Sequence, residues 1–132
     1  MHNLEYTKPT GIDGRQPKGK TLLMTPYEAF QLLELRVGRI QKAELHLKAR
    51  KPSYCLWIDL GPLGVKQSSA QITDLYTPQD LVGRLVICAT NLGERNIAGF
   101  RSEVLVLGLP DEAGRVVLLS AEREVPLGGR VF

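Results

Sequence analysis

The sequence predicts an all-β domain, and two features of the chain support this. Its apolar runs are short and are bounded by glycine, proline or charged residues, which is typical of strands rather than of long helices. A helix-start signature lies between the third and the fourth of these runs, at residues 77–80. Five or more short strands with one small helical insert describe an OB-fold five-stranded barrel, whereas an immunoglobulin-like sandwich would need more strands and no insert there.

A polar N-terminal segment is followed by the first predicted helix. Residues 1–24 are rich in proline, glycine and polar residues without hydrophobic periodicity, so we expect a flexible or extended N-terminal arm there, with the domain at 25–132. Thr25 can cap a helix, Pro26 suits its first turn, and Glu28 completes a capping box. We therefore expect a short helix that ends near Glu34.

The first three strands are predicted from runs of apolar and β-branched residues. Residues 35–47 alternate apolar and charged positions, and the break around Gly38 predicts a long strand with a bulge there. Residues 54–60 are rich in aromatic and branched side chains and predict the second strand. After a turn at 61–64, a more polar third strand is expected at 65–72.

The second half of the chain is organised around the stretch 91–109. Its first half is polar and contains glycines, whereas residues 104–107 are apolar and predict a strand buried on both faces. A rigid strand that holds a polar loop is a common arrangement for a binding site, although a solvated loop beside a core strand has the same composition. The other expected elements are a helical turn from Thr77 to Leu81 stopped by Gly83, a strand at 84–90, a turn at 111–114, a strand at 116–119 and a closing segment at 122–132.

Composition and charge restrict the possible functions. No apolar run reaches the ~20 residues of a membrane span, the N-terminus lacks a signal-peptide core, and Cys55 and Cys88 lie in apolar segments where reduced thiols are expected. We therefore expect a cytoplasmic protein without membrane insertion. The net charge of +3 is uneven, because the segment 36–51 contains Glu44 as its one acid. Its bases predict an anion-attracting face or a solvated surface, and they are Arg36, Arg39, Lys42, Lys48, Arg50 and Lys51.

Motifs for catalysis and for metal binding are missing from the sequence. His2 and His46 have no cysteine or acid at metal-ligand spacing, and no phosphate-binding glycine loop or nucleophile elbow is present. We therefore expect a protein that is not an enzyme and that needs no cofactor and no metal.

Four segments carry a family resemblance, and they are Ala49-Arg50-Lys51-Pro52, Leu56-Trp57-Ile58-Asp59, the stretch 64–73 and the stretch 91–108. They resemble the CsaA family of small bacterial proteins, which are related to the tRNA-binding domain appended to some aminoacyl-tRNA synthetases. The similarity extends from about Leu35 to the C-terminus. It implies an OB barrel with terminal extensions that form a homodimer, tRNA binding, and a chaperone-like part in protein export.

Two features depart from the family pattern. The arm before Thr25 is longer than expected, so nothing is transferred to it. In place of the F-P-P-R often seen after the asparagine, this chain has Leu92-Gly93-Glu94-Arg95. Arg95 stands at the position of the arginine in the family pattern, whereas Glu94 adds a negative charge that weakens phosphate binding there.

The leading hypothesis is a non-catalytic protein that binds tRNA through one face of the OB barrel. Lysine and arginine would contact phosphates, and amide or hydroxyl groups would bond bases, phosphates or 2′-hydroxyls. Structural roles stay open for several of these residues, such as an ion pair between Arg101 and Glu103. The candidate RNA-binding residues are Lys42, Lys66, Ser68, Ser69, Asn91, Arg95, Arg101 and Ser102.

The rival hypothesis is a chaperone for unfolded or precursor polypeptides, with no functional RNA role. It requires an apolar groove at a dimer interface, which Leu92, Ile97 and Phe100 would line. A domain that docks onto a partner and has no RNA role is a third alternative. The resemblance adds export machinery to the possible partners. A homodimer is expected because the helix and the C-terminal tail carry apolar residues outside the barrel strands.

Overall fold

The computed structural model describes residues 23–132, so the predicted arm lies almost wholly outside the described residues. The chain divides into two units, residues 1–33 and residues 34–132. The first contains helix α2 (Pro26–Leu32), whose capping box is formed as predicted. The Glu28 amide donates to Thr25 Oγ1 at 3.1 Å, and the Thr25 amide donates to Glu28 Oε1 at 2.8 Å.

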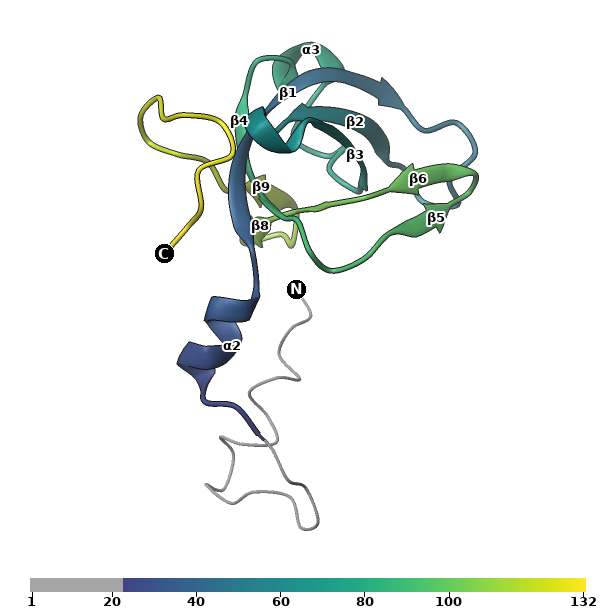
Figure 1. Ribbon diagram of the computed structural model, residues 1–132. Helices are drawn as coiled ribbons and strands as arrows, with labels where there is room; N and C mark the ends of the chain where they lie inside the picture. Colours follow the sequence, from purple (N-terminus) through teal and green to yellow (C-terminus); the bar gives the residue numbers. More distant parts are fainter. Residues whose placement is uncertain (1–22) are drawn as a thin grey trace. The chain divides into compact units, whose positions relative to one another are not determined.

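The second unit is an OB-fold barrel, which confirms the predicted all-β fold class (Figure 1). Its five-stranded sheet has the order β3-β2-β1-β4-β7, and each neighbouring pair is antiparallel. The amide of Val104, just before β7, donates to Gln67 O in β3 at 3.2 Å and brings the two edges of the sheet together. The strands are β1 (Leu35–Leu45), β2 (Tyr54–Asp59), β3 (Val65–Ala70), β4 (Leu85–Ala89) and β7 (Leu105–Val106).

Two short hairpins and two short helices complete the unit. Hairpin β5–β6 lies between β4 and β7, and hairpin β8–β9 follows β7 (Figure 1). The described residues contain no helix with the length and apolar character that crossing a membrane requires. The bounds of the remaining elements are β5 (Arg95–Ile97), β6 (Phe100–Ser102), β8 (Gly108–Pro110), β9 (Val116–Leu118), η1 (Gly61–Leu63) and α3 (Pro78–Leu81).

The core lies between the inner face of the sheet and α3. Alternation along β2 turns Leu56 and Ile58 inward, where both are fully buried with Val86 of β4. Helix α3 begins at the predicted capping box, in which the Asp80 amide donates to Thr77 Oγ1 at 3.1 Å. It contributes Leu81, which is also fully buried, so the predicted insert closes one side of the core.

The predicted bulge at Gly38 is misplaced. The irregularity in β1 lies between Ile40 and Lys42 on the side that pairs with β2, whereas Gly38 pairs regularly with Val86. A Cβ atom at Gly38 would lie 2.6 Å from Ile58 Cγ2. The glycine is therefore explained by the close approach of β1 to the core side chains and not by a bulge.

The strand predicted at 104–107 is shorter and less buried than expected. Only Leu105 and Val106 form β7, and Leu105 is 36% exposed while Val104 is buried. β7 pairs with β4 along one side, and its residues alternate between core and solvent. The expectation of a strand buried on both faces is therefore wrong.

Candidate nucleic-acid interface

The β5–β6 hairpin carries several of the predicted site residues, and its turn is set by local backbone geometry. Ala98 and Gly99 form the two-residue turn with φ of 50° and 89°, a pairing typical of a tight hairpin connection. The Gly99 amide donates to Asn96 Oδ1 at 2.8 Å and closes the turn from the side. Ala98 is the one non-glycine residue with positive φ in the described part of the chain.

Polar contacts dock this hairpin onto the edge strand β3. The Ser69 amide donates to Ser102 Oγ at 3.0 Å, and the Gln67 amide donates to Glu103 Oε1 at 3.0 Å. In return the Glu103 amide donates to Gln67 O at 2.7 Å. With its side-chain amide oriented as its neighbours require, Gln67 also accepts from Trp57 Nε1 at 3.0 Å. Ser69 and Ser102, both predicted site residues, therefore lie together at the base of the hairpin.

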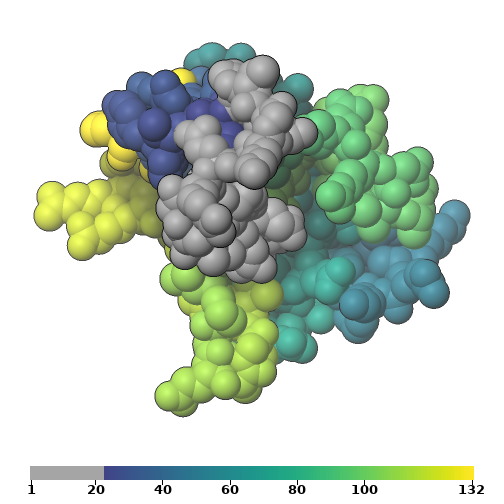
Figure 2. Space-filling model, turned by 90° about the horizontal axis from the view of Figure 1, so that it is seen from below, coloured from purple at the N-terminus to yellow at the C-terminus, as the bar shows by residue number. Residues whose placement is uncertain are grey.

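The hairpin is also fixed to the loop 46–53, which connects β1 to β2. His46 Nε2 is hydrogen-bonded to Ile97 O at 2.7 Å. The Phe100 ring makes edge contacts with His46 at 5.8 Å and with Trp57 at 5.4 Å between ring centroids. Loop and hairpin consequently lie side by side at one edge of the unit, in blue and green in Figure 2.

The basic side chains of this region fall into two groups according to their partners. Lys42 forms a salt bridge with Glu44 at 3.1 Å and lies 4.7 Å from the centre of the Trp57 ring. Arg101 lies between two carboxylates, with Nε 3.5 Å from Glu94 Oε1 and Nη2 3.8 Å from Glu103 Oε2. These two charges are already compensated within the protein.

The second group has no salt bridge to any residue of the described chain, and we call it the cationic face. Three of its members lie on the loop 46–53, and the fourth lies on β5. The loop residues were not selected from the sequence as site residues, although the basic segment 36–51 contained them. The cationic face consists of Lys48, Arg50, Lys51 and Arg95.

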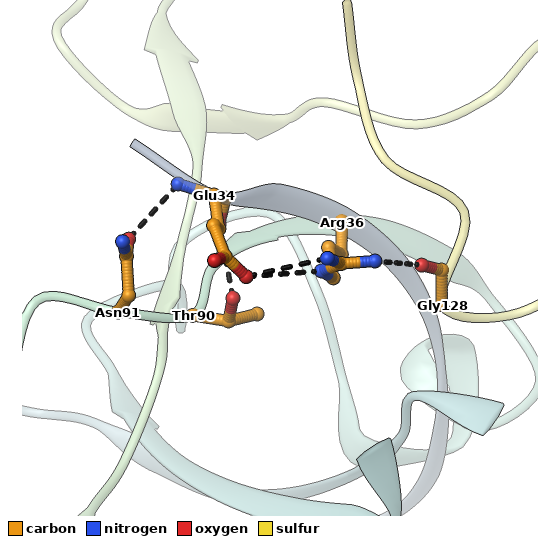
Figure 3. A network of polar contacts seen from close by, with 5 residues as sticks. All are labelled: Glu34, Arg36, Thr90, Asn91 and Gly128. Atoms are coloured by element: carbon orange, nitrogen blue, oxygen red, sulfur yellow. Dashed lines mark hydrogen bonds and ion pairs between the residues drawn. The ribbon is translucent and has the colours of Figure 1, made fainter. Parts of the chain in front are cut away.

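Asn91 belongs to a polar network that joins three segments of the unit (Figure 3). Its Oδ1 accepts from the Glu34 amide at 2.9 Å, and Thr90 Oγ1 donates to Glu34 O at 3.0 Å. Arg36 contacts Glu34 Oε1 at 3.3 Å and donates through Nη1 to Gly128 O at 2.9 Å. The carbonyl oxygen of Asn91 thus holds the loop after β4 against the start of β1.

Beside this network lies a hollow of about 300 Å³, which we call the polar hollow. It brings together the predicted residues Lys66 and Asn91 with the two carboxylates that flank Arg101. Its lining residues are Lys66, Thr90, Asn91, Gly93, Glu94, Glu103 and Val104.

A second hollow of about 300 Å³, the apolar hollow, lies between the loop 46–53 and the hairpin turn. Phe100 lines it, as the polypeptide-binding hypothesis requires, whereas Leu92 and Ile97 are not among its lining residues. Leu92 is exposed, and Ile97 and Phe100 are half-buried. The lining residues are Leu45, His46, Leu47, Lys48, Cys55, Ala98, Gly99 and Phe100.

Ser68 lies apart from the other predicted residues. It is opposite Leu56 in the β2–β3 register, and only 1% of its surface is exposed. The alternation of β3 turns Ser68 toward the core and its neighbours Gln67 and Ser69 toward the hairpin. Its side chain is out of reach of a macromolecular ligand.

Both cysteines are free thiols in buried positions. Burial raises the pKa of Cys88 to about 12, and burial followed by the nearby Glu44 carboxylate raises the pKa of Cys55. Both thiols are therefore poor nucleophiles at neutral pH. Residues 23–132 contain no group of three or more His, Cys, Asp or Glu side chains that would hold a metal ion.

The sequence was compared with protein families and with solved structures. Residues 35–130 match the family model described as "Putative tRNA binding domain". The chain belongs to this family. Two solved structures in its neighbourhood are a chaperone CsaA from Bacillus anthracis and a CsaA chaperone protein from Picrophilus torridus. The first is 48% identical with a TM-score of 0.77 and covers 83% of this chain and 99% of its own. The second is 38% identical with a TM-score of 0.76 and covers 83% of this chain and 100% of its own.

Curated relatives in the family include much longer proteins. Methionine–tRNA ligase of Archaeoglobus fulgidus is 38% identical over 79% of this chain, and that of Thermococcus kodakarensis is 33% identical over 86%. The chain spans about 15% of the length of each ligase. The resemblance to CsaA and to the tRNA-binding domain of synthetases, inferred from the sequence, is confirmed.

Proposed function

We propose that this chain binds tRNA through the cationic face and does not catalyse a reaction. The observation that carries the proposal is the set of four cations without a carboxylate partner in the described chain, on a loop and a hairpin fixed to each other. Phosphate groups would supply the missing anions, with Arg50 and Arg95 able to bond a phosphate through two N–H groups. Membership in the tRNA-binding-domain family supports the same ligand.

The remaining predicted residues have smaller roles in this proposal. Ser69 and Ser102 shape the base of the hairpin, because the Ser69 amide already uses the Ser102 hydroxyl oxygen. Asn91 fixes the loop after β4, and Ser68 is left out because it is buried. Lys42 and Arg101 are expected to contribute less than the cationic face, because an RNA phosphate must compete with Glu44, Glu94 and Glu103 for them.

Recognition of the RNA backbone fits this surface better than stacking of bases. Trp57 is half-buried between the Lys42 ammonium and the Phe100 ring, so its faces are largely used within the protein. A contact through phosphates reads the shape of the folded RNA and carries little sequence information. The cationic face is thus proposed to recognise the shape of tRNA.

A second candidate function is the binding of unfolded or precursor polypeptides by a chaperone with a part in protein export. The apolar hollow favours it, because Leu45 and Leu47 are 52% and 85% exposed beside Phe100. Apolar surface of this kind fits extended apolar peptides. The similarity to two solved CsaA chaperones points in the same direction.

We also propose that the protein is a homodimer. Exposed apolar residues lie on the second hairpin and at the C-terminus, where Leu109 is 56% and Phe132 is 106% exposed. Burial of such surface against a second copy about a two-fold axis would remove it from water. Sedimentation at micromolar concentration is expected to show a dimer, and a single 14.6 kDa species would contradict it. Two buried thiols suit the reducing cytoplasm that we propose as its location.

The salt dependence of tRNA binding tests the main proposal. Lys48→Ala, Arg50→Ala and Lys51→Ala combined should lower the slope of log affinity against log salt concentration by about 2 to 3, because each phosphate contact contributes roughly 0.7 to 0.9. Lys66→Ala and Arg101→Ala should each lower it by less than one such contact, because Glu94 and Glu103 lie beside both side chains. Fluorescence anisotropy of labelled total tRNA at four salt concentrations measures the slope.

The control is Arg123→Ala, which removes the same charge from a side chain that is 87% exposed in the closing segment. Figure 1 shows this segment on the other side of the barrel from β5–β6. An unchanged slope in the triple variant, or a decrease of about 1 in the single-charge control, would rule out the cationic face. Weakly salt-dependent binding of an unfolded polypeptide, without tRNA binding, would favour the second candidate.

A further inference from the structure

The polar hollow differs in chemistry from the cationic face beside it. Two carboxylates, Glu94 and Glu103, line it together with a single ammonium group, that of Lys66. The lining offers carboxylate oxygens as acceptors and one ammonium group as a donor, and Arg101, which flanks both carboxylates, compensates part of their charge. A neutral ligand edge that carries both donors and an acceptor matches this arrangement.

The central carboxylate of the hollow is held in place. Glu103 Oε1 accepts from the Gln67 amide at 3.0 Å, and the Glu103 side chain is 14% exposed. Its Oε2 lies 3.8 Å from Arg101 Nη2, beyond hydrogen-bond distance, and accepts no hydrogen bond from the described residues. One oxygen is therefore fixed by the backbone, and the other remains available to a ligand.

The walls of the hollow are fixed as well. The Val104 amide is bonded to Gln67 O at 3.2 Å, and Asn91 Oδ1 is bonded to the Glu34 amide at 2.9 Å (Figure 3). Gly93 has φ of 95°, which favours glycine, and a Cβ at this position would meet no atom within 4 Å, so this part of the lining faces open space. A preorganised site loses less entropy when a ligand enters than a mobile one does.

Among the parts of an RNA, the Watson–Crick edge of guanine fits these groups. It presents two neighbouring donors, N1–H and the 2-amino group, which a carboxylate accepts, followed by the O6 acceptor, which an ammonium group donates to. Uracil has no amino group, and a phosphate would meet two like charges. A hollow of about 300 Å³ has room for one base.

We propose that the polar hollow binds the guanine base of an unpaired nucleotide, with Glu103 accepting from N1–H and the 2-amino group and Lys66 donating to O6. This inference rests on the proposed tRNA binding and adds a base-specific contact to a surface that otherwise reads shape. The carboxylates of the lining make the hollow a poorer site for phosphate than the cationic face.

The test compares nucleotides that differ by one group. GMP and IMP carry the same phosphate, and IMP lacks only the 2-amino group, so their affinities for the full chain isolate that contact. Loss of a hydrogen bond to a charged acceptor should weaken IMP binding on the order of tenfold relative to GMP. NMR titration should show GMP shifting the Gly93 and Val104 amides. Equal affinities for GMP and IMP, or shifts centred on Ala98 and Gly99, would overturn the inference.

A matched pair of variants tests whether Glu103 is responsible for the preference for GMP over IMP. Glu103→Gln should bring the ratio of GMP to IMP affinity close to one, whereas Glu44→Gln, with the same charge change beside Lys42 on β1, should preserve it. Preservation of the ratio in a folded Glu103→Gln variant would contradict the assignment. If Glu103→Gln does not fold, the amide shifts in the unsubstituted protein decide the question.

The two proposals fail separately. A salt slope that depends on the cationic face, with no difference between GMP and IMP, would remove only the guanine site. Discrimination between GMP and IMP without measurable tRNA binding would instead remove only the proposed function.

Discussion

The two short hairpins of the barrel unit are both antiparallel pairs of three-residue strands, and they differ in the connection between the strands and in what their side chains do. In β5–β6 the turn is closed by a neutral side chain, with the Gly99 amide donating to Asn96 Oδ1 at 2.8 Å. In β8–β9 a carboxylate closes the turn, because Asp111 Oδ1 accepts from the Ala113 and Arg115 amides at 2.9 and 2.8 Å. The turn of β5–β6 is therefore closed by an uncharged amide, and the turn of β8–β9 by the ionised carboxylate of Asp111.

The outer faces of the hairpins differ as well. β5–β6 is docked by rings and polar groups from β2, β3 and the loop 46–53, and it bears Arg95, which has no salt bridge to a residue of the described chain. β8–β9 places Leu118 in the core and leaves Leu109 and Val117, a cross-strand pair, 56% and 39% exposed. The side chains on the outer face of β5–β6 are therefore mainly polar, whereas β8–β9 exposes an apolar cross-strand pair.

The largest effect is expected from the ring that docks β5–β6. Phe100→Ala removes its contacts with His46 and Trp57 and should lower the free energy of unfolding by about 2 kcal/mol, less than for a fully buried ring because Phe100 is half-buried. It should also weaken tRNA binding. Urea unfolding followed by circular dichroism and tRNA anisotropy measure the two effects.

Leu109→Ala on the other hairpin is the comparison. Its side chain is mostly exposed, so the free energy of unfolding should change by no more than about 0.5 kcal/mol, with tRNA affinity unaltered. Equal destabilisation by the two substitutions would show that Phe100 does not anchor its hairpin.

The turns provide the next effect, with opposite signs in the two hairpins. Ala98 has φ of 50° and Gly114 has φ of 82°, and a Cβ at Gly114 would meet no atom within 4 Å. Gly114→Ala should therefore cost about 1 kcal/mol through backbone strain alone, whereas Ala98→Gly should stabilise by about 0.5 kcal/mol after the added entropy of the unfolded chain. Thermal unfolding by calorimetry measures both. A stabilising Gly114→Ala would contradict the left-handed geometry of that turn.

The smallest effect is the response of the turns to acid. Hydrogen bonds from the Arg115 backbone first, and then from its side chain and the Ala113 amide, lower the pKa of Asp111 below its ordinary value. Because the folded-state pKa is the lower one, this stabilisation is present above the unfolded pKa of about 3.9 and is lost as the pH falls through the folded value. Asp111→Asn should therefore flatten the decrease in melting temperature below about pH 4.

Asn96→Asp is the opposite change, because it adds a carboxylate to the turn of β5–β6. It places a titratable group where Gly99 donates, so the melting temperature should become more sensitive to acid in the same pH range. Scans of melting temperature between neutral pH and strong acid test both variants. The assignment fails if Asp111→Asn leaves the acid dependence as it was. Asp80 in α3, whose pKa is lowered mainly by the Thr77 backbone, contributes the same background to every variant.

Local signals in the sequence were sufficient for elements that are stabilised locally. Both helices begin at the capping boxes of Thr25 and Thr77, and the turn at 111–114 is closed by its own aspartate. These contacts span three or four residues, so short sequence patterns specify them. The glycine at position 38 was misread, because its cause is a side chain of β2 that no local pattern shows.

The site was predicted less completely because it is assembled from distant segments. His46 and Ile97 are 51 positions apart, and their contact is what brings the lysines of the loop 46–53 beside the hairpin. The burial of Ser68 follows from the register of β2 with β3, which the sequence alone does not fix. The ion pair of Arg101 with Glu103 was considered from the sequence, since two residues on one short segment are always near each other.

The position of Trp57 has a practical consequence. It is the single tryptophan of the chain, and its indole touches the Lys42 ammonium on one side and the Phe100 ring of the hairpin on another. Tryptophan fluorescence therefore comes from one known position at the base of the hairpin. The emission maximum and the quantum yield depend on the nearby cation and aromatic ring. The native protein thus contains an optical reporter of hairpin position, and ligand binding can be followed without attaching a dye to the protein.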